Sequence, residues 1–291
     1  MPSAFFIGLG YSARPLADRL KSEGWQVIGT TRSQDKAADL KQSGIEAIIW
    51  DAGAPLDGDV LTQHEAVIVS VAPRDGTCPV ASALAPTPAK TRILYLSSSG
   101  VYGDYGGDWI NEAAPCRPGT ERGIVRLAAE RQWQALAEAG GAHLTLCRLA
   151  GIYGPGRNAV ESLAGDTPGA RAGLSRRLIK PGQVFNRVHR DDIARGLHAL
   201  LHTEDMPTIV NFADDEPGPP ADVITYAASL LGIAPPPEVR FEDIKDELSP
   251  MARSFYAENK RLKNDRLKAL VGDLRHPTYR EGLQAIAANR Q

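Results

Sequence analysis

Cysteine is scarce in this chain. Its 291 residues include only three cysteines, Cys78, Cys116 and Cys147, and no two of them form a CxxC pair. The odd count and the wide spacing argue against a framework of disulfide bonds. We therefore expect a protein of a reducing compartment and predict a cytoplasmic location.

Long apolar runs and an excess of charge are also missing. No run approaches the roughly 20 apolar residues that span a bilayer, and the opening MPSAFFIGLG has no basic lead, so it predicts a first strand rather than a signal peptide. The formal net charge of −2 gives no electrostatic reason to expect nucleic acid or an acidic membrane as partner. We expect a small-molecule substrate and leave a homodimer open.

Metal ligands and basic patches are not indicated either. The six histidines match no spacing that we associate with metal binding, so we predict no metal site. The basic stretch ENKRLKNDRLK near the C-terminus predicts the start of a helix with a solvated charged face.

The chain does contain a regular alternation of apolar runs and helical patterns. The runs AFFIGLG, WQVIGTTR, IEAIIWD, EAVIVSVAP and RILYLSSSG are near-continuously apolar and are separated by helices, which predicts a parallel sheet covered on both faces. We predict an α/β fold, with a Rossmann-type doubly wound parallel sheet and a smaller, partly helical C-terminal lobe. The expected sheet domain comprises residues 1–155 with 183–215 returning to it, and the expected substrate-binding lobe comprises 156–182 and 216–291.

The segment Gly8-Leu9-Gly10-Tyr11-Ser12-Ala13 is a GxGxxG/A pattern between the first strand and the first helix. The first glycine permits a tight turn, the second lets the backbone approach a pyrophosphate, and the small alanine allows close helix–strand packing. Amide groups at the helix N-terminus then bind phosphate oxygens. We assign dinucleotide binding to Gly8, Gly10, Tyr11, Ser12 and Ala13. The alternative is a glycine turn that only connects two elements.

The end of the second predicted strand selects between cofactors. NAD-binding proteins usually carry an acidic residue there, whereas this chain has Thr30-Thr31-Arg32-Ser33. A guanidinium and hydroxyl groups suit a 2′-phosphate, so Thr31 and Arg32 favour NADP(H), with NAD(H) as the less favoured cofactor. Arg32 could instead be a solvated loop residue. Asp51, which closes the third strand, suits the adenine amino group or simply opens a turn.

A later strand ends in YLSSSGVYGD. Together with GLGYSA, CRLAGIYGPGR and RVHRDDIARG, this motif makes the whole chain resemble an extended short-chain dehydrogenase/reductase of the NAD-dependent epimerase/dehydratase type. The resemblance implies that Ser98 is the catalytic serine, which hydrogen-bonds the reacting carbonyl or hydroxyl. We assign Ser97, Ser70 and Val71 to the cofactor site. The alternative for the serines is that strand-end hydroxyls bind loop backbone.

The next family feature is absent. The resemblance predicts a tyrosine and, four residues later, a lysine, but RGIVRLAAE has Arg122 and Arg126 there, while it keeps the accompanying Gly123 and Glu130. Arginine cannot release a proton in a protein, so neither arginine can act as a general acid or base. The two arginines either line an anion-binding face of the active site or belong to a solvated face, with Arg126 and Glu130 as a surface ion pair.

Two functions therefore stay open. Tyr102 is the phenol nearest to Ser98 in sequence and could transfer the proton, although the resemblance gives it a packing role. Gly151 stands where nucleotide-sugar enzymes of the family commonly have asparagine, which weakens that substrate class. The first hypothesis is an NADP(H)-dependent oxidoreductase or epimerase-like enzyme, similar to the atypical short-chain subgroup. The second is a non-catalytic NADP(H)-binding sensor or scaffold.

Overall fold

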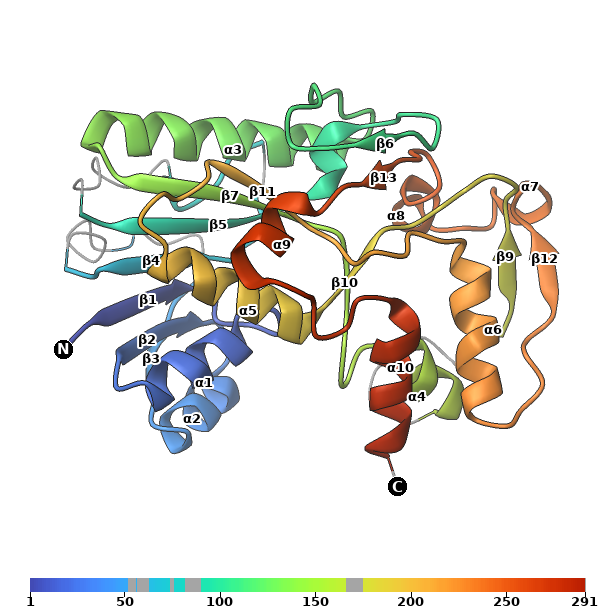
Figure 1. The fold of residues 1–291 in the computed structure, drawn as a ribbon, viewed down its shortest axis with the longest axis horizontal. Coiled ribbons are helices and arrows are strands. Elements are labelled where there is room, and N and C mark those ends of the chain that lie inside the picture. Colours follow the sequence, from blue (N-terminus) through green and yellow to red (C-terminus); the bar gives the residue numbers. More distant parts are fainter. Residues whose placement is uncertain (52–55, 57–62, 74–75, 82–89, 166–174, 291) are drawn as a thin grey trace. The chain divides into compact units, whose positions relative to one another are not determined.

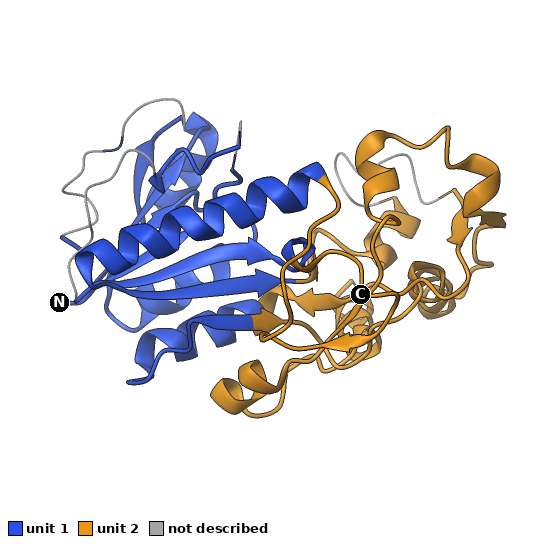
Figure 2. Ribbon diagram, turned by 90° about the horizontal axis from the view of Figure 1, so that it is seen from above, with its two compact units in different colours: residues 1–101, 121–149, 193–210 blue, residues 102–120, 150–192, 211–291 orange. Residues whose placement is uncertain are grey.

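The computed structural model of the chain (Figure 1) describes residues 1–51, 56, 63–73, 76–81, 90–165 and 175–290. The chain divides into two compact units (Figure 2): unit 1 comprises residues 1–101, 121–149 and 193–210, and unit 2 comprises 102–120, 150–192 and 211–291.

Unit 1 is built on a seven-stranded parallel sheet with the order β11-β7-β5-β4-β1-β2-β3. Its strands are β1 (Ser3–Ile7), β2 (Gln26–Thr31), β3 (Glu46–Ile49), β4 (Ala66–Val69), β5 (Arg92–Ser98), β7 (His143–Leu149) and β11 (Ile209–Phe212), the last of which continues into unit 2. Helices α1 (Arg14–Ser22), α2 (Gln34–Gln42) and α5 (Arg190–His202) lie on one side of the sheet and α3 (Glu121–Gly140) on the other (Figure 1). This doubly wound Rossmann-type arrangement confirms the predicted fold class.

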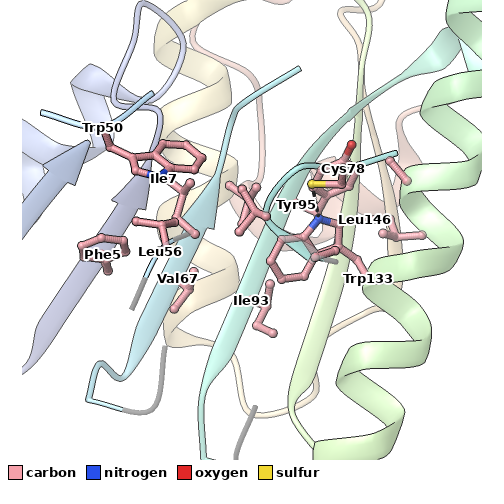
Figure 3. Close-up of a cluster of buried hydrophobic side chains, with 14 of the residues drawn as sticks. Phe5, Ile7, Trp50, Leu56, Val67, Cys78, Ile93, Tyr95, Trp133 and Leu146 are labelled. Atoms are coloured by element: carbon pink, nitrogen blue, oxygen red, sulfur yellow. Dashed lines mark hydrogen bonds between the residues drawn. The ribbon is translucent and has the colours of Figure 1, made fainter. Parts of the chain in front are cut away.

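One hydrophobic core cluster of unit 1 lies where α3 covers the sheet (Figure 3). Ile93 and Leu146 face it from neighbouring strands, and Trp133 packs onto it from α3. The indole ring of Trp133 is fully buried and stacks on the ring of Tyr95, with 6.0 Å between centroids. Its Nε1–H donates to the Cys78 sulfur at 3.3 Å. A sheet that is covered on both faces needs apolar residues at consecutive strand positions, which is why the strands read as continuous apolar runs.

Unit 2 consists of shorter elements. Its strands form parallel pairs: β8 (Gly151–Tyr153) with β10 (Arg187–His189), β9 (Arg177–Ile179) with β12 (Glu238–Arg240), and β6 (Trp109–Ile110) with β13 (Arg261–Leu262). Its helices are α4 (Ala159–Ala164), α6 (Pro220–Leu230), α7 (Phe241–Ile244), α8 (Pro250–Ser254), α9 (Asp265–Val271) and α10 (Tyr279–Ala288). Helices α4, α6 and α10 share an apolar cluster that includes Tyr153, Val160, Ala227 and Leu283.

The division between the units differs from the predicted boundaries. Residues 102–120, 150–155, 183–192 and 211–215 were expected in the sheet domain, but they belong to unit 2. The reason is that β8 and β10 pair with each other and do not join the large sheet. Within the described ranges, no helix is both long and apolar enough to cross a bilayer.

Candidate cofactor and active site

The strand order of the large sheet reverses between β1 and β4. In doubly wound sheets, ligands bind at the carboxyl ends of the strands at such a switch point. Gly8 follows β1 and Ser70 follows β4, so both residues lie at this point. The Ser70 hydroxyl donates to the Gly8 carbonyl, and the Ser70 N–H donates to the Ile7 carbonyl at 2.9 Å. The structure therefore brings together two segments that the sequence assigned separately to the cofactor.

Gly8 is held in a conformation that requires glycine. Its φ is +84°, and an added Cβ would lie 2.8 Å from Val71 Cγ1. The Gly8 N–H donates to Thr30 Oγ1 at 2.7 Å, and the Leu9 N–H donates to the Thr30 carbonyl at 2.9 Å. Thr30 was not among the predicted site residues, and its side chain fixes the turn from the neighbouring strand.

Gly29 also shapes this turn and was missed. An added Cβ at Gly29 would lie 2.6 Å from Leu9 Cδ2, so the glycine in β2 makes room for the leucine of the turn. The available signal was a glycine among the β-branched residues of β2. A glycine inside a strand often marks a place where a ligand or another part of the chain approaches closely.

Helix α1 begins at Arg14 without a capping side chain. Its N-cap residue, Ala13, makes no side-chain hydrogen bond, and the first turn carries no acidic residue. By contrast, Ser33 caps α2 and Asn158 caps α4 through their side chains. An added Cβ at Gly10 would meet only the Gly8 carbonyl, at 3.9 Å, so the space beside this turn is open. A helix start without a side-chain cap, beside open space, fits a diphosphate.

The remaining residues of the turn lie within the same loop. Tyr11 and Ser12 are half-buried and Ala13 is buried, as close packing of the helix against the sheet requires.

The hydroxyl groups of Thr31 and Ser33, at the end of β2 and just after it, form hydrogen bonds with nearby backbone N–H groups. Thr31 Oγ1 accepts from the Ser33 N–H at 3.4 Å, and the Ser33 hydroxyl accepts from the Lys36 N–H at the start of α2. Arg32 is exposed, and within the described part of the chain it forms no hydrogen bond or ion pair. Its guanidinium is therefore available to an anion, whereas Thr31 is buried. Asp51 is exposed two residues beyond the end of β3.

The two serines at the end of β5 have different roles. Ser97 is buried, and its hydroxyl donates to Glu130 Oε1 at 2.6 Å. Ser98 is half-buried, and its Oγ accepts from the Gly100 N–H at 3.2 Å in the turn that follows. Ser97 thus acts within the protein interior, and only Ser98 keeps an O–H to offer to a ligand. The local hydrogen bond of Ser98 is the strand-end contact that the alternative interpretation predicted.

Glu130 is not part of a surface ion pair with Arg126. Its side chain is 1% exposed and forms a two-pronged pair with Arg148, with Nε donating to Oε1 at 3.1 Å and Nη2 to Oε2 at 2.7 Å. The burial of this pair between α3 and β7 explains why a glutamate can occupy an interior position of the helix.

Arg126 contacts the sheet, while Arg122 is exposed. The Nη1 group of Arg126 donates to the Tyr95 hydroxyl at 3.3 Å and to the Leu96 carbonyl at 3.2 Å. Arg126 is therefore held against the carboxyl-terminal part of β5, where Leu96 lies two residues before Ser98. Burial raises the pKa of Tyr95 to about 12, so this phenol is neutral near pH 7.

Tyr102 has the packing role that the resemblance gives it. The residue is fully buried in unit 2, and its hydroxyl donates to Asn211 Oδ1 at 2.7 Å. The Asn211 N–H in turn donates to Glu112 Oε1 at 2.9 Å. A phenol that is committed to a buried amide in this way is poorly placed to exchange a proton with a ligand.

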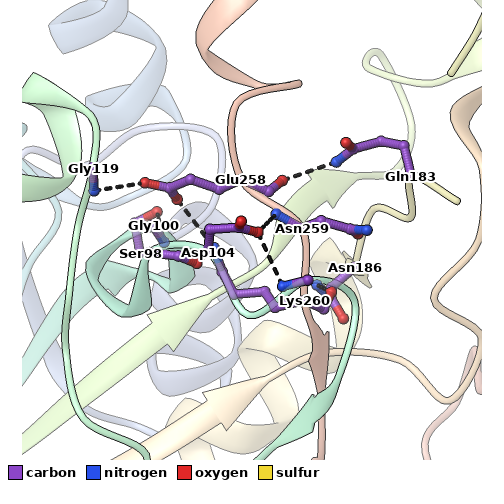
Figure 4. A network of polar contacts seen from close by, with 11 residues as sticks. Ser98, Gly100, Asp104, Gly119, Gln183, Asn186, Glu258, Asn259 and Lys260 are labelled. Carbon is purple, nitrogen blue, oxygen red and sulfur yellow. Dashed lines mark hydrogen bonds and ion pairs between the residues drawn. The ribbon is translucent and has the colours of Figure 1, made fainter.

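A buried lysine in unit 2 was missed (Figure 4). Lys260 is 7% exposed, and its Nζ donates to the Gly103 carbonyl at 2.7 Å and to Glu258 Oε2 at 3.1 Å. Glu258 Oε1 accepts from the Gly119 N–H at 3.1 Å. The predicted helix start is found only in the second half of this stretch, where α9 begins at Asp265, because Lys260 is buried and is followed by strand β13. The network ties the loop that follows Tyr102 to the C-terminal segment.

His189 supports the turn that opens α5. Its Nδ1 accepts from the Asp191 N–H at 3.1 Å, and its ring lies 3.8 Å from that of His276. Burial, followed by the proximity of His276, lowers the pKa of His189 to about 4. The imidazole is therefore neutral near pH 7.

Comparison with known proteins identifies the family. Residues 8–213 match the NAD dependent epimerase/dehydratase family. The chain belongs to this family. Protein YeeZ of Escherichia coli K12 is 32% identical over 255 residues, which cover 81% of this chain and 86% of YeeZ.

Two solved structures extend the comparison. A conserved protein of unknown function from Silicibacter pomeroyi is 41% identical, with a TM-score of 0.85 and 99% of both chains covered. A UDP-glucuronic acid 4-epimerase from Bacillus cereus, solved in complex with NAD, is 15% identical, with a TM-score of 0.75 and coverage of 98% of this chain and 96% of that one. At that identity the second likeness concerns the fold alone.

Proposed function

We propose that unit 1 binds a nicotinamide dinucleotide, with NADP(H) preferred over NAD(H), and that the protein is an oxidoreductase or epimerase-like enzyme acting on a small molecule. The observation that carries the proposal is the tight Gly8 turn at the switch point, followed by open space at Gly10 and a helix start without a side-chain cap. This arrangement offers backbone amides and a close backbone approach, which a diphosphate needs. Membership of the family supports the same cofactor class.

The cofactor, when bound, would supply hydride transfer to or from a carbon that bears oxygen. The Ser98 hydroxyl would donate to the substrate oxygen. Arg126 would take over part of the work of the family's lysine, because its Nε and Nη2 can donate to ribose hydroxyls while Nη1 holds β5. The exposed Arg122 would bind an anionic group of the substrate. Since neither arginine releases a proton and Tyr102 is committed to Asn211, the proton would reach the substrate through water.

The second candidate is a sensor or scaffold that binds NADP(H) without turnover. Two observations favour it: both arginines lack acid–base chemistry, and the hydroxyls of Ser97 and Tyr102 are engaged inside the protein. The sensor requires the same cofactor site as the enzyme and differs only in that no hydride is transferred. Assays of NADPH oxidation with aldehydes, ketones and quinones, beside a binding titration, distinguish the two. Turnover that Ser98→Ala reduces supports the enzyme, and tight binding without turnover supports the sensor.

The cofactor site itself is tested by Gly10→Ala. The added methyl group fits the folded chain, because only the Gly8 carbonyl lies within 4 Å of it, but it occupies space that a pyrophosphate would need. We expect unchanged thermal stability and at least a roughly 10-fold loss of NADPH affinity, in line with the close approach required at this position. Gly218→Ala in unit 2, where an added Cβ is also tolerated, is the matched control. Equal affinity for the wild type and Gly10→Ala would contradict the proposal.

The preference for NADP(H) is tested by Arg32→Asp. The substitution removes a cation that suits the 2′-phosphate and adds an acceptor that suits ribose hydroxyls. We expect NADPH affinity to fall far more than NADH affinity in calorimetric titrations. Arg131→Asp, an exposed charge reversal on α3, is the control for long-range charge effects. Equal losses for both cofactors would refute the assignment of Arg32.

A further inference from the structure

Two histidines and a glutamate lie together on the surface of unit 1. His198 and His202 are four residues apart on α5, so they share one face of the helix. Glu23 is the C-cap residue of α1. One nitrogen or oxygen that could bind a metal from each of the three lies within 4.8 Å of the other two. The prediction that histidine spacing is uninformative overlooked this i, i+4 pair.

The three side chains already contact one another. His198 Nε2 lies 2.9 Å from Glu23 Oε2. The two imidazole rings are stacked, with 4.2 Å between centroids and 24° between planes. The end of α1 and the end of α5 are thus connected through nitrogen and oxygen atoms of the kinds that commonly bind transition metals.

The hydrogen bond of His202 to the backbone selects its tautomer. His202 Nδ1 lies 2.8 Å from the His198 carbonyl oxygen. A carbonyl oxygen only accepts, so Nδ1 carries the hydrogen and the lone pair of the neutral ring lies on Nε2. Metal-binding histidines commonly donate their second nitrogen to a carbonyl in this way, which fixes the ring orientation and raises its basicity.

We propose that His198, His202 and Glu23 form a binding site for a divalent transition metal, of which zinc is the best match, and that the bound ion joins the end of α1 to the end of α5. Two imidazoles and a carboxylate are a ligand set that zinc uses, with a fourth position open to water. In a tetrahedral site the ligand atoms lie about 3.3 Å apart, given bonds of about 2.0 Å. Glu23 and His202 are exposed, so their side chains can close the remaining distance.

Arg19 competes with the metal. Its Nε donates to Glu23 Oε1 at 3.0 Å, so the guanidinium shares the carboxylate and repels a cation. Removal of this charge is expected to strengthen metal binding. This expectation separates a metal site from a simple His–Glu contact, because Arg19→Ala and Glu23→Gln should change metal affinity in opposite directions.

The test is titration of the tag-free, full-length protein with Zn²⁺ by calorimetry, together with thermal unfolding in EDTA and in excess Zn²⁺. We expect one strong site in the wild type, and a rise in Tm of roughly 5 °C when free Zn²⁺ is 100-fold above Kd. His198→Gln/His202→Gln and Glu23→Gln should weaken binding by roughly 10-fold or more, and Arg19→Ala should tighten it. His143→Gln removes an exposed histidine of β7 and should have no effect.

Each other outcome overturns the proposal. Wild-type protein that binds no Zn²⁺ at 100-fold excess over protein has no such site. Binding that survives the double histidine substitution belongs to other ligands, such as Cys116 or His276. Since the three residues lie at the surface, the variants should fold, and unchanged Tm values in EDTA verify this.

Discussion

Arg126 holds the phenol of Tyr95 and the carbonyl of Leu96 through a single nitrogen, Nη1, at 3.3 Å and 3.2 Å. The family resemblance predicts a lysine at the position of Arg126, and we propose that the arginine takes its place. A guanidinium has five N–H donors in a fixed plane, so Nε and Nη2 stay available after these two bonds. An arginine in place of that lysine would therefore keep a donor beside the end of β5, but it could not release a proton.

Arg126→Ala is expected to weaken binding of the nicotinamide part of the cofactor. A hydrogen bond from a charged donor contributes roughly 1.5–3 kcal/mol, so we expect about a 10-fold loss of affinity for both NADPH and NADH. The adenosine fragment 2′,5′-ADP lacks the nicotinamide ribose, and its affinity should not change. Fluorescence titration with all three ligands measures the difference. A parallel loss for 2′,5′-ADP would show that Arg126 supports the fold of unit 1 instead of the ribose.

Substitution of one member of the buried pair of Glu130 and Arg148 is expected to destabilise the protein strongly. Both side chains are at most 5% exposed, and removal of one partner leaves the other charge buried and unpaired, which costs roughly 3–5 kcal/mol. Arg148→Met should therefore lower the urea midpoint strongly, and Arg148→Met/Glu130→Leu should recover most of the loss. If both variants unfolded at the wild-type midpoint, the pair would be solvated in solution.

The alternation of strands and helices along the chain could be predicted from sequence because apolar runs and glycine turns are local signals. The Gly8 turn was found for this reason, whereas Ser70 and Val71 were assigned from the family resemblance. The hydrogen-bond partners of the polar side chains could not be predicted in the same way. Nothing local distinguishes Ser97, which is bonded to Glu130, from Ser98, because the partner lies 33 residues away on α3. Lys260 was likewise read as solvated because the Gly103 carbonyl, which accepts its hydrogen bond, is 157 residues distant.

His189 is expected to make stability depend on pH. Its pKa falls from about 6.5 in the unfolded chain to about 4 in the folded one, so the unfolded state binds more protons between these values. The contribution is fully present above pH 6.5 and is lost as the pH falls toward 4, by roughly 3 kcal/mol in total. His189→Asn keeps an acceptor near the Asp191 N–H but does not titrate. Its urea midpoint should vary less between pH 7 and pH 4.5, and an equally steep decline would assign the effect to other groups.

Asp214 should make stability depend on pH in the opposite direction, so that stability falls as the pH rises. It is 2% exposed, its Oδ1 accepts from the Glu216 N–H at 3.3 Å, and within the described residues its Oδ2 has no partner. Burial raises its pKa well above the usual value, although the charge of Arg187 opposes the shift. The folded state therefore binds the extra proton, and stability is lost as the pH rises through the raised pKa. Asp214→Asn keeps the acceptor and stays neutral, so we expect it to equal the wild type near pH 4 and to exceed its urea midpoint at pH 7 and 8. A lower midpoint for Asp214→Asn at pH 8 would mean that an ionised carboxylate pairs with Arg187 in the folded protein.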